Sequence, residues 1–283
     1  MEKNVLSTDL HGKVAVVTGA GGVLCSGFSK ALARAGARVA LLDRNLEAAR
    51  KWADEIIAEG GTARAYCCDV LDKAVCLETA AAVEKDLGPC DLLINGAGGN
   101  NPRATVDKEY YEPGDLDADT KSFFDLDADG VGFVFNLNFL GTLIPTQAFA
   151  RQMLGRKGCS ILNVSSMNAF TPLTKIPAYS GAKAAVSNFT QWLAVHFSKA
   201  GIRVNAIAPG FFSTAQNAAL LWNADGTPTA RTGKILAATP MGRFGEPEEL
   251  EGALLFLLDE KAASFITGVV LPIDGGFSAY SGV

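Results

Sequence analysis

Long apolar runs and an excess of basic residues are both missing from this 283-residue sequence. No hydrophobic run approaches the ~20 residues that a membrane-spanning helix needs. The first thirteen residues are polar and charged and lack the apolar core of a signal peptide. The 25 basic residues are outnumbered by 30 acidic ones, so we expect no broad basic surface for nucleic acid or anionic lipid. Together these absences predict a cytoplasmic protein without a membrane segment.

Histidine is also scarce, and the cysteines follow no pattern typical of a metal site or of a disulfide framework. The two histidines, His11 and His196, are not placed for catalysis, and the six cysteines match neither zinc-ligand spacings nor a secreted disulfide framework. Adjacent Cys67 and Cys68 would point to opposite faces of a strand, which suits reduced thiols packed as small hydrophobic groups. Residues 125–130 match the opening of an EF-hand loop, but the twelfth position is Asn136 rather than glutamate. The sequence therefore predicts no metal site.

Short β-branched runs alternate with longer segments of helical period. Near-continuous apolar strands separated by helices indicate a parallel sheet covered on both faces. The expected strands are residues 13–19, 37–43, 63–69, 91–95, 159–165, 203–208 and 269–273, and helical segments include 26–35, 46–59 and 73–87. With right-handed crossovers, this pattern predicts a single α/β domain over residues 1–283, a Rossmann-type doubly wound parallel sheet.

Two segments interrupt this alternation. Residues 99–130 are long and acidic, and residues 211–243 are polar and rich in turns. Both follow the carboxyl ends of strands, where open α/β sheets bind ligands. Long irregular loops inside a compact domain are usually functional. We therefore expect these two segments to form the walls of a substrate pocket.

The first two strands end in residues suited to a dinucleotide. Gly19, Gly21 and Gly22 lie between the first strand and a helix expected to begin near Ser26, where glycine lets a phosphate approach the helix N-terminus. The second strand ends at Asp43, at about the spacing expected of a carboxylate that binds the adenosine ribose. Because a carboxylate there repels a 2′-phosphate, the sequence predicts NAD rather than NADP.

The next two strands end in similar fashion. Asp69 and Val70 follow the third strand, where a carboxylate could reach the adenine amino group. Asn95 begins the run Asn-Gly-Ala-Gly at the end of the fourth strand, and its small residues would let the backbone lie against a cofactor. The order of these signals along successive strands is more informative than any one of them.

Tyr179 and Lys183 carry the expected chemistry. Their spacing of four places them on one face of a helix. A nearby ammonium favours the phenolate and so lowers the tyrosine pKa from its ordinary value near ~10, which makes Tyr179 a general acid/base. Ser166, thirteen residues earlier, could hydrogen-bond the substrate oxygen, and Asn138 could anchor a water that carries protons from Lys183.

With these pieces the sequence resembles the short-chain dehydrogenases/reductases over residues 12–283. The resemblance implies a catalytic tetrad of Asn138, Ser166, Tyr179 and Lys183, a nicotinamide-binding segment at 209–214, and a homotetramer. One departure concerns the family's glycine turn, Thr-Gly-x-x-x-Gly-x-Gly, whose last two glycines are Val23 and Cys25 here. The expected cofactor-binding residues are Gly19, Gly21, Gly22, Val23, Leu24, Asp43, Asp69, Val70, Asn95, Ala97, Gly98, Tyr179, Lys183, Pro209, Gly210, Phe212 and Thr214.

Several blocks are similar to a narrower group in this family, the D-mannonate oxidoreductases of the short-chain type, also called fructuronate reductases. The blocks are residues 95–105, 123–130, 165–183, 241–246 and 274–283. This resemblance implies that D-fructuronate and D-mannonate are interconverted with NADH and NAD.

A sugar acid also needs hydrogen-bond donors and a cation for its carboxylate. We expect these from Asn100, Arg103, Asn168 and Lys175. Two other functions stay open: the same chemistry on gluconate, 5-ketogluconate or another polyol or keto-sugar acid, and an NAD-binding sensor that has lost catalysis.

Overall fold

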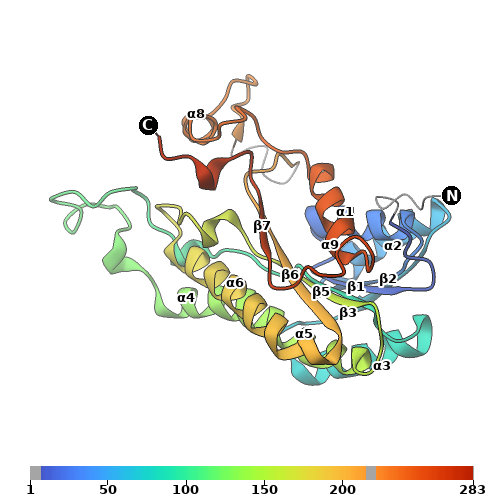
Figure 1. The fold of residues 1–283 in the computed structure, drawn as a ribbon. Helices are drawn as coiled ribbons and strands as arrows, with labels where there is room; N and C mark the ends of the chain where they lie inside the picture. The colour runs from blue at the N-terminus through green and yellow to red at the C-terminus, as the bar shows by residue number, and fades with distance from the viewer. Residues whose placement is uncertain (1–7, 215–220, 283) are drawn as a thin grey trace.

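All seven expected strands are present in a computed structural model, which describes residues 8–214 and 221–282. They form one parallel sheet in the order β3-β2-β1-β4-β5-β6-β7, and each lies within two residues of its expected bounds (Figure 1). The strands are β1 Val14–Thr18, β2 Arg38–Asp43, β3 Thr62–Cys67, β4 Leu92–Asn95, β5 Cys159–Val164, β6 Ile202–Pro209 and β7 Val270–Ile273. The expected Rossmann-type sheet in a single α/β domain is confirmed.

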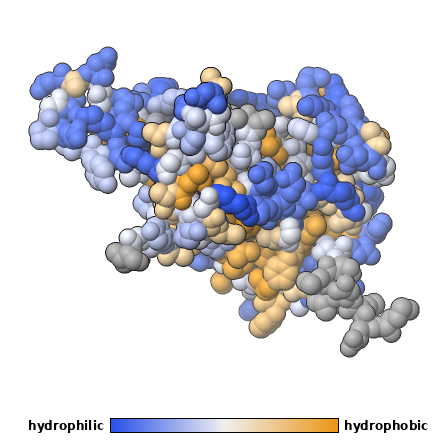
Figure 2. All heavy atoms as spheres, turned by 90° about the horizontal axis from the view of Figure 1, so that it is seen from above, coloured by the Kyte–Doolittle hydropathy of each residue, from blue (hydrophilic) through white to orange (hydrophobic). Residues whose placement is uncertain are grey.

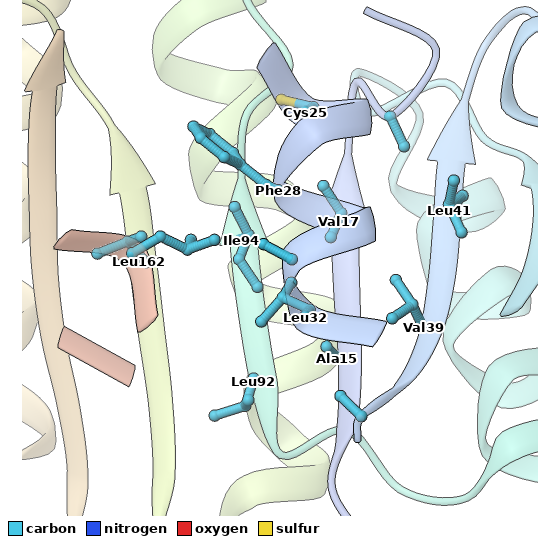
Figure 3. Packing of buried hydrophobic residues seen from close by; sticks show 14 of the residues in the cluster. Ala15, Val17, Cys25, Phe28, Leu32, Val39, Leu41, Leu92, Ile94 and Leu162 are labelled. Carbon is cyan, nitrogen blue, oxygen red and sulfur yellow. The ribbon is translucent and has the colours of Figure 1, made fainter. Parts of the chain in front are cut away.

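Helices cover both faces of this sheet (Figure 1). On one face lie α1 Val23–Arg34, α2 Leu46–Ala58 and α9 Glu251–Leu258, and on the other lie α3 Lys73–Leu87, α5 Gly141–Met153 and α6 Pro177–Phe197. Strand residues alternate between the two faces. Val17 lies in one buried cluster with Phe28 of α1 (Figure 3), whereas Val16 lies in a second cluster with Phe149 of α5. Every residue of β1 is buried because both faces are covered.

Helix α1 begins three residues earlier than expected. Gly22 is extended and caps the helix, and the amide of Ser26 already donates to the Gly22 carbonyl at 2.9 Å. The expected start near Ser26 was wrong because the apolar residues Val23 and Leu24 look like part of the turn, although their backbone is helical. The positive end of the α1 dipole therefore lies directly beside the glycine turn.

The two segments that interrupt the alternation contain short helices. α4, Ala128–Phe135, begins at the end of the 99–130 segment and continues through a π-helical turn, Asn136–Leu140, into α5. α8, Ala230–Ala237, lies within the 211–243 segment, of which 215–220 fall outside the described residues. In the described part of the chain, no helix combines the length and apolar character that a bilayer crossing requires.

Candidate active site

A cleft of about 610 Å³ opens at the carboxyl ends of β1 to β4, where the strand order reverses direction. This is the position at which doubly wound sheets bind ligands. Twelve of the residues expected to bind the cofactor line it: Gly19, Gly22, Val23, Leu24, Asp43, Asp69, Val70, Ala97, Gly98, Gly210, Phe212 and Thr214. The structure thus brings together residues from several separate segments of the chain.

Five of the expected cofactor residues are outside this lining. Gly21 lies behind Asp43, Pro209 is the last residue of β6, and Tyr179 and Lys183 lie beside the cleft on α6. The Asn95 side chain is buried below it, where Nδ2 donates to Thr146 Oγ1 and Asn163 Oδ1, both at 2.9 Å.

Other lining residues were not expected. Most are neighbours of expected ones, so the same glycine turn and strand ends point to them: Cys25, Arg44, Cys68, Leu71, Gly96 and Phe211. Phe133 of α4 and Leu137 of the π-helical turn also line the cleft, and nothing in the sequence separates them from ordinary helix residues.

Asp43 is held rigidly at one end of the cleft. Its Oδ2 accepts from the Gly21 amide at 2.9 Å and its Oδ1 from the Asn45 amide at 2.8 Å. A Cβ atom on Gly21 would lie 2.9 Å from Asp43 Oδ2 and 2.8 Å from the Ala48 methyl, so only glycine fits between them. The glycine turn therefore fixes the carboxylate with lone pairs left for the hydroxyls of a sugar.

The four residues expected to be catalytic meet beside the other end of the cleft. Lys183 is buried on α6 with Nζ donating to the Val164 carbonyl at 2.8 Å, and 5.7 Å from the ring centre of Tyr179. Ser166, two residues after the end of β5, lies close enough to the Tyr179 phenol for its hydroxyl to lower the pKa of that phenol. Asn138 and Lys183 both border Gly98 of the cleft: a Cβ there would lie 2.6 Å from Asn138 Oδ1 and 3.2 Å from Lys183 Nζ.

Asn138 occupies the π-helical turn between α4 and α5. Its Nδ2 donates to the carbonyls of Gly99 and Val134, both at 2.8 Å, and its Oδ1 accepts from the Gly99 amide at 3.3 Å. π-helical turns recur at functional sites because the extra residue redirects a side chain. Here the turn clamps the start of the 99–130 segment against the catalytic group.

Burial shifts both titrating groups toward their neutral forms. The pKa of Lys183 is lowered to about 8 because its ammonium loses hydration inside the protein. The pKa of Tyr179 is raised because burial of the phenolate outweighs the hydrogen bond from Ser166, which lowers it. The expectation that Lys183 lowers the tyrosine pKa is wrong in this structure. A phenol with a raised pKa keeps its proton at neutral pH and is a proton donor.

Residues 13–223 match the family model for short chain dehydrogenase. The chain belongs to the short-chain dehydrogenase family. A Bacillus subtilis protein named as the uncharacterized oxidoreductase UxuB is 51% identical over 98% of this chain and 99% of its own. A gluconate 5-dehydrogenase from Gluconobacter oxydans is 36% identical over 95% of this chain and 96% of its own.

A solved structure is closely similar. It is a Haemophilus protein with bound NAD that carries the provisional name D-mannonate oxidoreductase. It is 62% identical, covers 99% of this chain and 100% of its own, and superimposes with a TM-score of 0.95. With the family and the site geometry, this identifies the chain as a dehydrogenase, an oxidoreductase with a Rossmann-type sheet.

The residues expected to bind substrate separate into two pairs. Asn100 and Arg103 are exposed, and both side chains already have partners within the protein. Asn100 Nδ2 donates to Thr105 Oγ1 at 3.1 Å, and Arg103 forms an ion pair with Asp127 at 2.8 Å. Asn168 is 5% exposed, and its backbone amide donates to Ser166 Oγ at 3.2 Å. The buried Oδ1 of its side chain has no hydrogen-bond partner in the part of the chain that the structure describes. Asn168 is thus the expected substrate residue that adjoins the catalytic serine.

Lys175 precedes α6, four residues before Tyr179. Its carbonyl accepts from the Val106 amide at 3.0 Å, which holds it against the 99–130 segment. Among residues 8–214 and 221–282, its ammonium forms no ion pair, although it contributes to the lowered pKa of Glu109. It is a half-buried cation beside the catalytic helix.

The two segments expected to form the substrate pocket contact each other. Glu109 of the 99–130 segment forms an ion pair with Lys234 of α8 at 2.6 Å. The 99–130 segment projects from the body of the dehydrogenase, and its surface is predominantly hydrophilic (Figures 1 and 2). Several of its carboxylates are used within the segment itself, as where Lys108 pairs with both Glu112 and Asp115 at 2.7 Å. These pairs neutralise part of its acidic charge.

Cys25, which replaces a glycine of the family's turn, lies against a glycine from another part of the chain. Cys25 lies in the first turn of α1, above Val17 and Ile94 (Figure 3). A Cβ atom on Gly96 would collide with the Cys25 sulfur, so the thiol occupies space that a side chain at 96 would need. Thus glycine at 96 allows the larger residue at 25 without displacing the turn.

We predict that Gly96→Ala destabilises the dehydrogenase by about 1–3 kcal/mol, because the added methyl overpacks against Cys25. Cys25→Ala should relieve the clash, so the double variant should be more stable than the sum of the single changes predicts. Urea unfolding followed by tryptophan fluorescence measures each free energy of unfolding.

Gly27→Ala, also in α1 with open space around its Cα, is the matched control and should be neutral or stabilising. Strictly additive effects of Cys25→Ala and Gly96→Ala would show that the two positions do not constrain each other.

Proposed function

We propose that this dehydrogenase interconverts D-fructuronate and D-mannonate with NADH and NAD. The observation that carries the proposal is the meeting of Asn138, Ser166, Tyr179 and Lys183 beside a cleft whose far end holds Asp43. The NAD bound to the Haemophilus protein and the name that protein carries support the choice of cofactor and substrate.

The cleft fits a dinucleotide. Gly19 has a φ of +67° and faces the Ala97 backbone so closely that a Cβ would lie 2.8 Å from Ala97 Cα. Backbone amides of the glycine turn and the N-terminus of α1 suit a pyrophosphate. Asp43 would accept hydrogen bonds from the adenosine ribose and repel a 2′-phosphate. Residues 209–214 would hold the nicotinamide end, because Gly210, Phe212 and Thr214 line that side.

The proposed reduction needs a hydride and a proton. Bound NADH supplies the hydride to the keto carbon. Ser166 holds the keto oxygen against Tyr179, whose phenol donates the proton to that oxygen. Lys183 and Asn138 lie behind the tyrosine and serve to return a proton to it. Because the pKa of Tyr179 is raised, the phenol holds its proton at neutral pH, which is the form that reduction of D-fructuronate requires.

Substrate recognition rests on Lys175 and Asn168 in this proposal, within a pocket walled by residues 99–130 and 211–243. Lys175 supplies the cation for the sugar-acid carboxylate, since it forms no ion pair among the described residues. The side-chain amide of Asn168, whose Oδ1 has no partner among the described residues, supplies hydrogen bonds to a substrate hydroxyl. Arg103 and Asn100 would act from the rim after exchanging their present partners.

A gluconate-type substrate is the second candidate, favoured by the 36% identity to the Gluconobacter gluconate 5-dehydrogenase. It differs from the first only in the sugar acid, so the same residues would serve it. A non-catalytic sensor is the weakest alternative, because a sensor has no need of a buried tyrosine, lysine and serine in contact.

We also propose that the dehydrogenase is a cytoplasmic homotetramer. A groove of about 510 Å³ runs between α5 and α6 and is lined mainly by apolar side chains. The large apolar residues Trp192 and Val195 are 56% and 77% exposed on α6 beside it. Exposed apolar surface of this kind is typical of contacts between subunits.

The first prediction of the proposal concerns turnover. Purified protein should oxidise NADH rapidly with D-fructuronate, more slowly with 5-ketogluconate, and should use NADPH poorly because of Asp43. Absorbance of the reduced cofactor gives kcat and KM for each pair. Faster turnover of 5-ketogluconate would reject the fructuronate assignment and leave the dehydrogenase chemistry standing.

Tyr179→Phe should lower kcat about 100-fold or more, because it removes the proton donor. NADH affinity, measured by fluorescence titration, should be unchanged. Tyr66→Phe is the matched control, since the Tyr66 phenol bonds Asp86 at 3.1 Å, away from the cleft, and the variant should keep full activity. An active Tyr179→Phe enzyme would remove Tyr179 from the proton-transfer step.

Lys175→Met should raise KM for D-fructuronate about tenfold or more, because a charge-assisted hydrogen bond is lost, with a smaller effect on kcat. Lys175→Arg should restore most of the affinity, and Lys157→Met, an exposed lysine before β5, is the control. If Lys175→Met and Lys157→Met change KM equally, Lys175 does not bind the carboxylate.

A further inference from the structure

Two thiols lie in contact at the edge of the cleft that the proposed function assigns to the adenine. Cys68 follows β3 and lines the cleft, and Cys76 lies in the first turns of α3. Their sulfur atoms are 3.8 Å apart. The turn between them, residues 69–72, supplies Asp69, Val70 and Leu71 to the cleft wall.

The turn is anchored on both sides by these cysteines. The Cys76 thiol also lies 3.6 Å from the Asp69 carbonyl, and the Asp69 carboxylate accepts from the Leu71 amide at 2.9 Å. A disulfide has a sulfur–sulfur distance of about 2.05 Å, so the two sulfur atoms must approach each other, by rotation of the side chains or by movement of β3 toward α3. Such a movement of β3 would displace the turn.

We propose that Cys68 and Cys76 are an oxidation site, at which hydrogen peroxide forms an intramolecular disulfide that weakens dinucleotide binding. The location in the cleft wall carries the proposal, because Cys68 is buried except where it lines the cleft that a dinucleotide would fill. Cys67 cannot replace Cys68. It is exposed on the other face of the strand, where its sulfur lies 3.6 Å from the Arg44 carbonyl.

The pair is chemically unequal, as this reaction requires. The pKa of Cys68 is lowered because hydrogen bonding with the Cys76 thiol and the Thr79 hydroxyl stabilises its thiolate. The pKa of Cys76 is raised well above the ordinary value because of the same bond and of burial. Cys68 is therefore the nucleophile of the pair, since it lines the cleft, which Cys76 does not, and the thiolate is the reactive form.

The reaction balances in two steps. The Cys68 thiolate attacks one peroxide oxygen, so a sulfur–oxygen bond forms, the oxygen–oxygen bond breaks, and the departing hydroxide takes a proton to become water. The Cys76 sulfur then attacks the Cys68 sulfur. The disulfide forms, the sulfur–oxygen bond breaks, and the second hydroxide leaves with the Cys76 proton as water. Two thiols are oxidised by two electrons, and one peroxide is reduced to two waters.

Thermodynamic linkage relates the effect of the disulfide on NADH binding to the effect of NADH on the disulfide. If the disulfide weakens NADH binding by about tenfold, NADH must shift the thiol–disulfide equilibrium by the same factor toward the thiols. That factor corresponds to about 30 mV in the reduction potential of the pair. This half of the proposal rests on the proposed function, which puts the adenine at Asp69, whereas disulfide formation does not.

Mass spectrometry of the peroxide-treated protein tests the site. After free thiols are blocked, trypsin leaves Cys67 and Cys68 on peptide 65–73 and Cys76 on peptide 74–85. We expect a cross-link between these peptides with the loss of two hydrogens, assigned to Cys68 by fragmentation and reversed by dithiothreitol. Cys67→Ser should keep the cross-link, and Cys68→Ser and Cys76→Ser should lose it. A cross-link through Cys67, or none in the wild-type protein, overturns the proposal.

NADH titration of the oxidised and reduced wild-type protein tests the coupling. We expect about tenfold weaker binding after oxidation, slower cross-linking when NADH is present, and no effect of peroxide on binding by Cys76→Ser. Equal affinities with a confirmed cross-link would overturn the coupling to the cleft. Failure of the reduced protein to bind NADH would instead count against the proposed function, and the cross-link would still report on the cysteines.

Discussion

The site depends on the hydroxyl of Thr18, which fixes the two strand ends at which the cleft opens. Thr18 is fully buried at the end of β1, and its Oγ1 accepts from the amides of Gly96 and Ala97 at 3.0 and 3.2 Å. These two bonds tie the ends of β1 and β4 together at the point where the strand order reverses. The backbone beyond each strand must then turn away to opposite sides. The glycine turn follows from this constraint, because Gly19 has to pass within contact of the Ala97 backbone.

A second set of buried polar contacts connects this edge to the catalytic residues. Asn95, next to Gly96, bonds both Thr146 of α5 and Asn163 of β5. Thr146 donates to the Thr142 carbonyl at 2.7 Å, and Thr142 donates to the Asn138 carbonyl at 2.9 Å. Buried polar groups that are bonded in this way fix one arrangement of the elements, since any other leaves them unpaired. The strand end that borders the cofactor cleft and the helical turn that carries Asn138 are therefore positioned by one network.

Much of this arrangement could be predicted from the sequence, because it depends on local patterns. The strands follow from β-branched runs that are buried on both faces, and the pairing of Tyr179 with Lys183 follows from their spacing on a helix. The lengths of α1 and of the π-helical turn could not be predicted, because Val23 and the residues near Asn138 have no distinctive side chains. The contact of Cys25 with Gly96 joins two elements far apart in the sequence, so the departure at Cys25 could be noticed in the sequence but its structural partner could not.

The tyrosine pKa shows why electrostatics could not be predicted from the sequence. A charged lysine nearby lowers a tyrosine pKa, whereas loss of hydration around the phenolate raises it. Here burial lowers the pKa of Lys183 to about 8, and the loss of hydration at Tyr179 is the larger influence on the phenol, so the tyrosine pKa is raised. Burial depends on how α6 packs against β5 and the π-helical turn. The spacing of residues in the sequence therefore does not predict the direction of the pKa shift. The same burial limits the contact of the phenol with water, which suits the transfer of its proton to an oxygen at Ser166 that the proposed function requires.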